Sequence, residues 1–475
     1  MSVSSYRSIL ASLFLASACG APAPAPGHLE QRISGQAAVD WLAPGSEVPV
    51  WLEERLAPWP ALPLDRDLGP RQLVRATASA AREVVWAPPE TERLTAAVAH
   101  PAGAWSAVGV DGERRPFLVR GDRSGALARI TLDDPELAGD PASWIGTSPP
   151  AALRVSVLSE DSVRIGGTAD EVVVSLVSEQ NAVLVYRFRW DGARWQRGPR
   201  TLVSPALVQT PYLPIGASYD NFDAVVNAFS ARLAVINKEG DGGGAYVALT
   251  ATDSRLRRHN AVFGTRFAPL RSDETQTYRP TDLLIARIER NGAVAWTRLV
   301  GTPDVDDEVY ALAAGPAGEA ALVGRVRRER GRDNTEWHPT VTVLDGAGAP
   351  LTAAAFDAAD SGIAQSAAFA PDGSLFVGGT EGWLQNPEGI SLGKEGRPFL
   401  LRLRAHPTTG LLGVAPVRVD GVLPATRGHA ELRGLAVAGG RLWLCGLERG
   451  PLTHTGDADR SLVRADGWRL SLELP

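Results

Sequence analysis

Residues 368–378 read AFAPDGSLFVG, which is a run of small residues, a Pro-Asp-Gly turn and a second apolar run that ends in glycine. The same pattern recurs at 98–109, 313–324 and 435–446, and more weakly at 247–264. Short apolar runs bounded by Pro, Asp and Gly are typical of β-strands joined by tight turns. The chain therefore repeats one β-structured unit.

A second hairpin follows each unit after a connection of variable length. Its first strand reads RPFLVR at 115–120 and RPFLLR at 397–402, with related runs at 282–287, 340–344 and 459–464. A turn such as 290–292 or 465–467 then leads to a last strand. Four strands per unit, recurring roughly every 55–75 residues, predict the blades of a β-propeller.

The fold class that we predict is an all-β propeller with four-stranded antiparallel blades. The first strand of each blade lies nearest the axis, where crowding favours Ala, Gly and Ser, and each blade must stack on its neighbours. First-strand candidates lie near residues 97, 173, 247, 310, 366 and 434, and they favour six blades. The extra hairpin-like runs 153–167 and 222–237 leave seven open.

A family resemblance supports this fold. The stretch LIARIERNGAVAWTRLVG (284–301), followed by DDEVYALAA (306–314), resembles the SBBP-type β-propeller repeat of secreted bacterial proteins and lipoproteins. The resemblance covers 281–447, is weaker around 94–131, and is lost over 150–265. It implies a propeller fold and an exported location, and it implies no activity and no catalytic residues.

The N-terminus reads as an export signal. Arg7 precedes an apolar run over 9–18, which is shorter than the ~20 residues that span a bilayer and fits a signal peptide over 1–18. The run ends LASAC at Cys19, which resembles the lipobox of bacterial lipoproteins and implies a lipid on that cysteine. Residues 19–31 would then be the lipidated cysteine and an Ala/Pro-rich linker. The alternative is a plain signal peptide with an incidental cysteine.

The residue after Cys19 is Gly20 and not Asp, which by the same resemblance favours an outer-membrane lipoprotein facing the periplasm or the cell surface. The membrane partner would be reached through the lipid. Only two cysteines are present, so a lipidated Cys19 leaves Cys445 without a disulfide partner. Cys445 lies in an apolar run, and we expect a buried thiol there.

Composition narrows the function. Lys and Arg number 48 against 54 Asp and Glu, a net charge of −6, which argues against a nucleic-acid partner. Residues 32–92 lack the repeat, and we predict an irregular segment packed on the propeller with short helices over 37–42 and 72–85. Residues 93–475 would form the propeller itself.

No catalytic or metal constellation is evident, and we expect no cofactor. The acidic run Asp304–Glu308 has the oxygen ligands that Ca²⁺ prefers, but it reads better as a solvated turn. Loops on a rigid scaffold are the usual place of recognition. We therefore predict binding through the loops 265–280, 325–338 and 379–396. The candidate binding residues on these loops are Tyr278, Trp337, Trp383, Arg328 and Arg330.

These features favour a lipid-anchored envelope propeller that acts as a non-enzymatic binding or scaffold module for a protein or polysaccharide. One alternative is a propeller enzyme that acts on glycans, with carboxylates from different blades meeting at the central channel. Another is a structural part of a larger envelope complex.

Overall fold

A computed structural model of the chain places most of the strand-forming residues. It describes residues 28–33, 37–43, 50–55, 71–76, 82–113, 115–132, 163–177, 183–203, 225–236, 243–252, 281–301, 307–329, 335–356, 361–382, 396–404, 417–419, 423, 430–449 and 465–474. Within these segments no helix is long and apolar enough to cross a bilayer. The predicted signal peptide and Cys19 lie outside the described residues.

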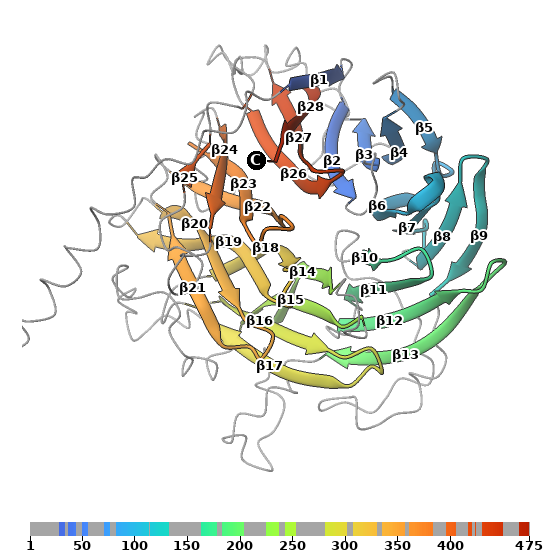
Figure 1. Cartoon of the computed structure of the whole chain (residues 1–475), viewed down its shortest axis with the longest axis horizontal. Helices are drawn as coiled ribbons and strands as arrows, with labels where there is room; N and C mark the ends of the chain where they lie inside the picture. Colours follow the sequence, from blue (N-terminus) through green and yellow to red (C-terminus); the bar gives the residue numbers. More distant parts are fainter. Residues whose placement is uncertain are drawn as a thin grey trace, which may run out of the picture.

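The strands form seven four-stranded antiparallel sheets, which we number as blades 1 to 7 (Figure 1). Blade 1 holds β2 (Ala37–Ala43), β3 (Val50–Arg55), β4 (Arg71–Ala76) and β5 (Arg82–Trp86). Blade 2 holds β6 (Arg93–Ala99), β7 (Trp105–Val110), β8 (Pro116–Asp122) and β9 (Gly125–Thr131), with a turn of 3₁₀ helix, η2 (Pro101–Gly103), between β6 and β7. Blade 3 holds β10 (Arg164–Gly167), β11 (Glu171–Val177), β12 (Val183–Trp190) and β13 (Trp195–Val203).

The remaining four blades follow in chain order. Blade 4 holds β14 (Val225–Val235), β15 (Ala245–Thr252), β16 (Thr281–Ile288) and β17 (Val294–Val300). Blade 5 holds β18 (Asp307–Ala314), β19 (Ala320–Glu329), β20 (Thr335–Leu344) and β21 (Pro350–Ala355). Blade 6 holds β22 (Gly362–Phe369), β23 (Leu375–Glu381), β24 (Arg397–Leu403) and β25 (Val417–Arg418). Blade 7 holds β26 (Ala430–Ala438), β27 (Arg441–Arg449), β28 (Ala465–Glu473) and β1 (His28–Ile33).

The blades stand around a centre in the order of the chain, with the first strand of each blade innermost (Figure 1). Hydrophobic side chains fill the space between neighbouring sheets. Between blades 2 and 3, for example, Val108 and Leu118 pack with Val172 and Leu184. Both faces of a sheet are buried in this way, which is why the strands are apolar almost throughout.

The predicted propeller with four-stranded antiparallel blades is confirmed, but the favoured count of six blades is wrong. Two of the six first-strand candidates, near 173 and 247, are second strands, β11 and β15. The runs that we expected to be extra hairpins contain the true first strands of those blades, β10 and β14. The blade missing from the predicted six is blade 1, which lies within residues 32–92, where we predicted an irregular segment.

Residues 37–86 contain strands where helices were expected. The predicted helix over 37–42 is β2, and the predicted helix over 72–85 falls on β4 and β5. Trp51 and Leu52 on β3 are fully buried, because this sheet closes the gap between blade 7 and blade 2. A segment that completes a ring needs no core of its own, since its neighbours supply both covering surfaces.

The ring is closed by the first described strand of the chain. β1 pairs antiparallel with β28, so that the N-terminal strand is the outermost strand of the last blade. The turn expected at 465–467 is therefore the start of β28, which pairs with β27 on its other side. No fourth strand is needed after β28, and the linker predicted over 19–31 gives way to strand at His28.

The two faces of the ring differ. Because consecutive strands are antiparallel, the first-to-second and third-to-fourth connections leave one face, which we call the short-turn face. The second-to-third and blade-to-blade connections leave the opposite, long-connection face. The short-turn face has turns at 123–124, 191–194 and 289–293, whereas the long-connection face has connections at 132–163, 204–224 and 253–280.

Candidate functional site

Five of the seven first strands contain a β-bulge, which is one residue inserted into the pairing with the second strand. The bulges lie near the start of each strand, on the side of the long-connection face. The bulged residues are Asp40 in blade 1, Thr95 in blade 2, Tyr310 in blade 5, Gln365 in blade 6 and Arg433 in blade 7. In blade 4 the register also shifts, between Asn227 and Arg232.

The bulge has the same effect on packing in each of these strands. In blade 5, Val309 packs toward blade 4 and Ala311 packs toward blade 6, with Tyr310 between them. In blade 7, Leu432 packs toward blade 6, and Ala436 packs with Trp51 of blade 1. The bulged residue is an extra residue in the innermost strand of its blade, so its backbone lies beside the centre of the ring (Figure 1).

The bulge also explains the glycine that ends each repeat. It turns a first-strand carbonyl toward the second strand, where a Cβ atom would meet it. A Cβ on Gly324 would lie 1.8 Å from the carbonyl oxygen of Glu308, and a Cβ on Gly446 would lie 1.9 Å from that of Glu431. The same clash, at 2.0 and 2.3 Å, would arise at Gly379, which directly follows the repeat-ending glycine of blade 6, and at Gly109. The repeated glycine therefore marks the position opposite a bulge.

Blade 5 carries a cluster of charged and aromatic side chains at this level, which we call the blade 5 cluster. Its members are Glu308, Tyr310, Arg325 and Trp337. The Arg325 Nε atom donates to Glu308 Oε2 at 2.8 Å, and the Tyr310 hydroxyl donates to the same oxygen at 2.7 Å. The Arg325 guanidinium lies 3.9 Å from the centre of the Trp337 ring and 5.4 Å from that of Tyr310.

Burial fixes the protonation state of Tyr310. Desolvation raises the pKa of its phenol well above the ordinary value, and the neighbouring Arg325 opposes this effect without cancelling it. The phenol therefore keeps its proton at neutral pH and acts as the donor to Glu308. Arg232 of blade 4 donates to the carbonyl of Tyr310, which ties the bulge to the preceding blade. The cluster is thus an arrangement in which a neutral phenol and a guanidinium both donate to one carboxylate oxygen.

The described parts of the stretch 325–338 are strand and not the loop that we predicted, and residues 330–334 lie outside the described residues. Arg325 to Glu329 continue β19 and pair with Thr335 to Pro339 of β20. The pairing runs past the start of β18 and the end of β21, so these two strands project beyond the sheet on the long-connection face. Trp337 therefore stands on a strand, half-buried, and Arg328 pairs across from Glu336.

The other predicted binding residues cannot be placed in this way. Tyr278, Trp383 and Arg330 lie outside the described residues, and so do most of the loops 265–280 and 379–396. Their flanking strands are second and third strands of blades 4 and 6. The connections that contain Tyr278, Arg330 and Trp383 therefore start from the same face of the ring, as the sequence predicted for the three loops.

The acidic run 304–308 is described only in part, because residues 304–306 lie outside the described residues. Asp307 and Glu308 begin β18, and Asp307 is buried. Within the described parts of the chain, no group of three or more His, Cys, Asp or Glu side chains could hold a metal ion. Cys445 is buried beside Trp51 and Trp443, which confirms the expectation of a buried thiol.

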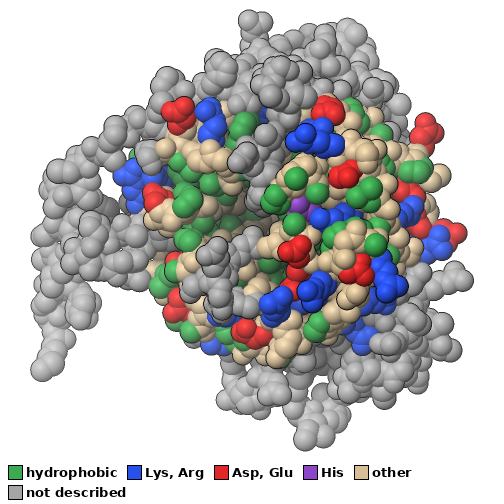
Figure 2. All heavy atoms as spheres, turned by 45° about the vertical axis from the view of Figure 1, so that its right-hand side comes forward, with side chains coloured by type: hydrophobic (Ala, Val, Ile, Leu, Met, Phe, Trp, Pro, Cys, Tyr) green, Lys and Arg blue, Asp and Glu red, His purple; other side chains and the backbone are tan. Residues whose placement is uncertain are grey.

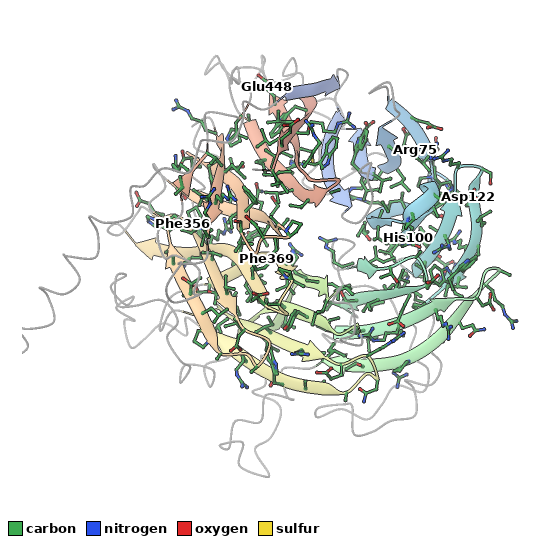
Figure 3. All side chains as sticks on the ribbon, in the orientation of Figure 1. Arg75, His100, Asp122, Phe356, Phe369 and Glu448 are labelled. Carbon is green, nitrogen blue, oxygen red and sulfur yellow. The ribbon has the colours of Figure 1, made fainter. Side chains whose placement is uncertain are left out.

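His100 is a buried polar residue that sequence reasoning did not single out. It follows β6 and lies toward the centre of the ring, as does Phe369 (Figure 3). Its Nε2 atom lies 2.8 Å from the Ser106 hydroxyl. Burial, helped by the charge of Arg120, lowers the pKa of His100 to about 3, so the ring is neutral and serves as a structural hydrogen-bond partner.

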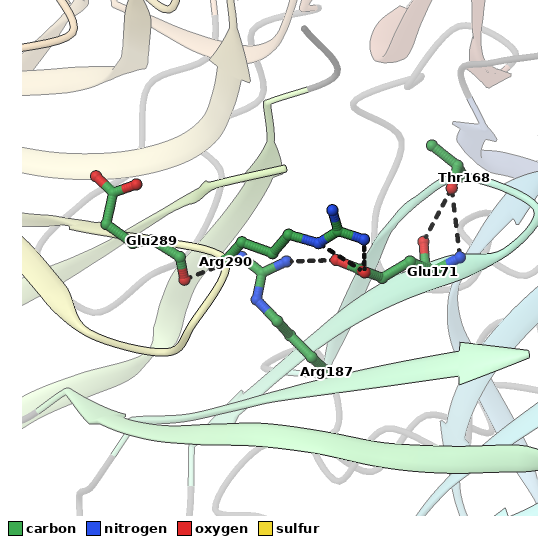
Figure 4. A network of polar contacts seen from close by, with 5 residues as sticks. All are labelled: Thr168, Glu171, Arg187, Glu289 and Arg290. Atoms are coloured by element: carbon green, nitrogen blue, oxygen red, sulfur yellow. Dashed lines mark hydrogen bonds and ion pairs between the residues drawn. The ribbon is translucent and has the colours of Figure 1, made fainter. Parts of the chain in front are cut away.

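The short-turn face carries a network that joins neighbouring blades (Figure 4). Glu171 of blade 3 accepts from Arg187 of its own blade at 2.9 Å and from Arg290 of blade 4 at 2.8 Å. Similar hydrogen bonds join other neighbouring blades. Arg120 of blade 2 donates to the Ala169 carbonyl of blade 3, and the Tyr246 hydroxyl of blade 4 donates to the Gly318 carbonyl of blade 5. These arginines are occupied in holding adjacent blades together, so this face has a structural role.

On the face shown in Figure 2, charges of both signs are interspersed among the described side chains. The polar and aromatic side chains on the β19–β20 pair include Arg325 and Trp337, which are in contact with each other.

The fold and the position of these groups define a seven-bladed β-propeller. No family model matches the chain, and no curated protein matches it in sequence. Solved structures similar to it include a polysaccharide lyase, with 10% identity, coverage of 92% of this chain and 90% of that one, and a TM-score of 0.44. The WD40 domain of Toxoplasma gondii coronin has 11% identity, coverage of 96% and 89%, and a TM-score of 0.43.

A third similar structure is BamB from Moraxella catarrhalis, with 11% identity, coverage of 93% of this chain and 99% of that one, and a TM-score of 0.34. The comparisons also include the Aleuria aurantia lectin in complex with α-methyl-L-fucoside, with 12% identity, coverage of 84% and 99%, and a TM-score of 0.33. At these values the assignment of the fold rests on the sheets of this chain itself.

Proposed function

We propose that this chain is a lipid-anchored propeller of the bacterial envelope that binds a protein or polysaccharide partner through its long-connection face. The observation that carries this proposal is the difference between the two faces. The short-turn face uses its arginines to join blades, whereas the long-connection face carries the projecting β19–β20 pair and the long connections. Binding surfaces are commonly built on such connections above a rigid scaffold.

The side chains on the projection support a binding role. Arg325 and Trp337 are in contact on one face of the β19–β20 pair, and aromatic and arginine residues are enriched among the residues that anchor interfaces. Ser361 holds Trp337 in place, because its hydroxyl accepts from the Trp337 backbone N–H at 2.9 Å. A pre-positioned aromatic ring loses little freedom when a partner binds.

The charges of the first strands support binding rather than glycan hydrolysis. Glu308 forms an ion pair with Arg325 at 2.8 Å, and Glu431 forms one with Arg433 at 2.9 Å. A general acid needs a carboxyl group that holds a proton near neutral pH. In both pairs the Oε2 atom of the carboxylate already accepts from an arginine of its own blade, so it is not presented to a substrate.

The anchor in this proposal rests on the lipobox-like ending at Cys19 and on the resemblance to SBBP-type repeats of exported proteins. β1 begins at His28, so only residues 20–27 separate the proposed lipid from the outer strand of blade 7. Because an extended chain spans at most about 3.6 Å per residue, this spacer would keep the propeller within about 30 Å of the membrane surface.

The experiment that tests the proposal is capture of partners from crosslinked envelopes. We expect the wild-type chain to recover one defined partner, and we expect a triple variant with Trp337, Trp383 and Tyr278 changed to Ala to lose it. The matched control is Trp190→Ala, which removes an indole beside the short turn at 191–194. Equal recovery by the folded triple variant would place the binding surface elsewhere. Loss of recovery in the control alone would assign binding to the short-turn face.

A further inference from the structure

The bulged residues of blades 5, 6 and 7 occupy equivalent places in three consecutive blades. Tyr310, Gln365 and Arg433 are each the fourth residue of their first strand. The three first strands are neighbours around the centre of the ring (Figure 1). Equivalent positions in neighbouring blades lie at the same depth along the axis, so these three side chains form an arc at one level.

The three residues of the arc are polar and partly exposed to solvent. Each of the three is half-buried, in contrast to Thr95, the bulged residue of blade 2, which is buried and donates to the Val163 carbonyl of blade 3 at 3.0 Å. β-Bulges are over-represented beside functional sites because they re-aim a side chain. In blades 5 to 7 the inserted residue is a phenol, a carboxamide and a guanidinium, which together supply donors and acceptors.

Each bulged residue is held by a fixed partner in its own blade. Tyr310 donates to Glu308 at 2.7 Å, and Arg433 donates to Glu431 at 2.9 Å. The Gln365 amide oxygen accepts from Thr380 at 3.1 Å, which leaves the direction of its amide group defined. These contacts hold the polar atoms in place before a ligand arrives, which lowers the cost of ordering them on binding.

The charge balance of the arc indicates the chemistry of its ligand. Glu308 is matched by Arg325, Glu431 is matched by Arg433, and Gln365 is neutral. The arc therefore has no surplus of either charge from these groups. It offers a phenol, a carboxamide and a guanidinium, which between them supply hydrogen-bond donors and acceptors and one aromatic ring. Vicinal hydroxyl groups, each of which donates and accepts a hydrogen bond, match such an arrangement.

We propose that Tyr310, Gln365 and Arg433 form one binding site at the inner edge of blades 5 to 7, and that it takes an uncharged, hydroxyl-rich saccharide. This site rests on the proposed binding function and makes it specific, since it names a ligand class and three residues other than Trp337 that would bind it.

The test uses the full chain without its signal peptide on an array of oligosaccharides. The neutral probes are oligomers of glucose, galactose, mannose, fucose and N-acetylglucosamine, and the acidic probes are alginate and hyaluronan fragments. We expect binding to at least one neutral class, and at least tenfold weaker binding by the variant that combines Tyr310→Phe, Gln365→Leu and Arg433→Gln. Thr95→Ser is the matched control, because it alters a bulge outside the arc and keeps its hydroxyl.

Each outcome decides the proposal. Neutral-saccharide binding that the folded triple variant loses and the control keeps supports it. Equal binding by the triple variant overturns the location, and binding to acidic probes alone overturns the ligand class. If the wild-type chain binds no saccharide, the saccharide site is overturned, while partner capture from envelopes judges the broader binding function separately. Single substitutions, beginning with Tyr310→Phe, replace the combined variant if its thermal transition is lost.

Discussion

Substitution of Gly324 by Ala tests whether the repeated glycines exist because of the bulges. A Cβ atom on Gly324 would lie 1.8 Å from the Glu308 carbonyl oxygen and 2.8 Å from its carbonyl carbon. Real Cβ atoms essentially never approach another heavy atom closer than 3.0 Å. The atoms in contact are backbone, so no side-chain rotation can relieve the clash. β18 and β19 must separate by about 1 Å, or the bulge must rearrange.

The expected cost follows from the place of this strand pair. β18 is covered by blade 4 on one side and blade 6 on the other, so it cannot shift without disturbing two hydrophobic clusters. Overpacking in a closed core typically costs about 1–3 kcal/mol. A backbone clash on this scale belongs at the upper end, and we expect the free energy of unfolding to fall by about 2–3 kcal/mol. With a urea m-value near 3 kcal/mol/M, the midpoint would fall by roughly 0.7–1 M.

Urea unfolding followed by tryptophan fluorescence measures this change. The matched control is Gly112→Ala, because a Cβ there would meet nothing nearer than 3.5 Å, and its midpoint should stay within about 0.2 M of wild type. Deletion of Tyr310 should rescue Gly324→Ala, because it removes the extra residue and leaves Val309 and Ala311 on opposite faces of a regular strand. A Gly324→Ala protein as stable as the control would refute the reasoning.

Three further predictions concern the anchor, the ring and pH. Cys19→Ser should release the protein from membranes into the soluble fraction, whereas a mutant that still sediments with the envelope would contradict lipid anchoring. Deletion of 459–475 removes β28, which leaves β1 without a partner and one edge of β27 unpaired, so we expect loss of the whole cooperative thermal transition by circular dichroism, not a small shift. Stability should fall as pH is lowered from 6.5 toward 3, since the unfolded chain takes up a proton on His100 that the folded ring excludes. The cost should be on the order of 2 kcal/mol between pH 7 and pH 5, and a His100→Asn variant should lose this part of the pH dependence.

The repeat itself was sufficient to predict the propeller and the four-stranded blade. The runs at 115–120 and 397–402 are third strands, as predicted, because apolar runs beside a tight turn form strands wherever both faces are covered. The blade count failed at blade 1, whose strands between residues 37 and 86 do not match the repeat. In blades 3 and 4 the second strands β11 and β15 were taken for first strands, which misplaced those blades' first strands without changing the count.

Pairings between distant parts of the chain could not be predicted from local pattern. The segment AAVDWLA (37–43) has no alternation of apolar and polar residues, and it forms β2 because blades 2 and 7 cover it. The run 459–464 resembles other third strands, yet the third strand of blade 7 begins at Ala465, because β1 supplies the fourth.

The candidate site was predicted in part. Aromatic and arginine residues on the long-connection face were expected, and Trp337 does lie there in contact with Arg325. The bulges were not expected, since an inserted residue looks in sequence like a break in alternation and not like a site. The glycine opposite each bulge was the available signal, and it was read as a strand ending.

The closure of the ring by β1 has a consequence for how the protein is made. His28 is added to the growing chain long before its partner Ser471, which lies 443 residues further along the sequence. Folding rates fall as contacting residues lie further apart in the chain, so this pairing is expected to be a late and slow step. Until it forms, β28 presents an unpaired edge of the kind that promotes aggregation. A chaperone that shields the C-terminal blade should therefore raise the yield of folded protein more than one that acts on the N-terminal half.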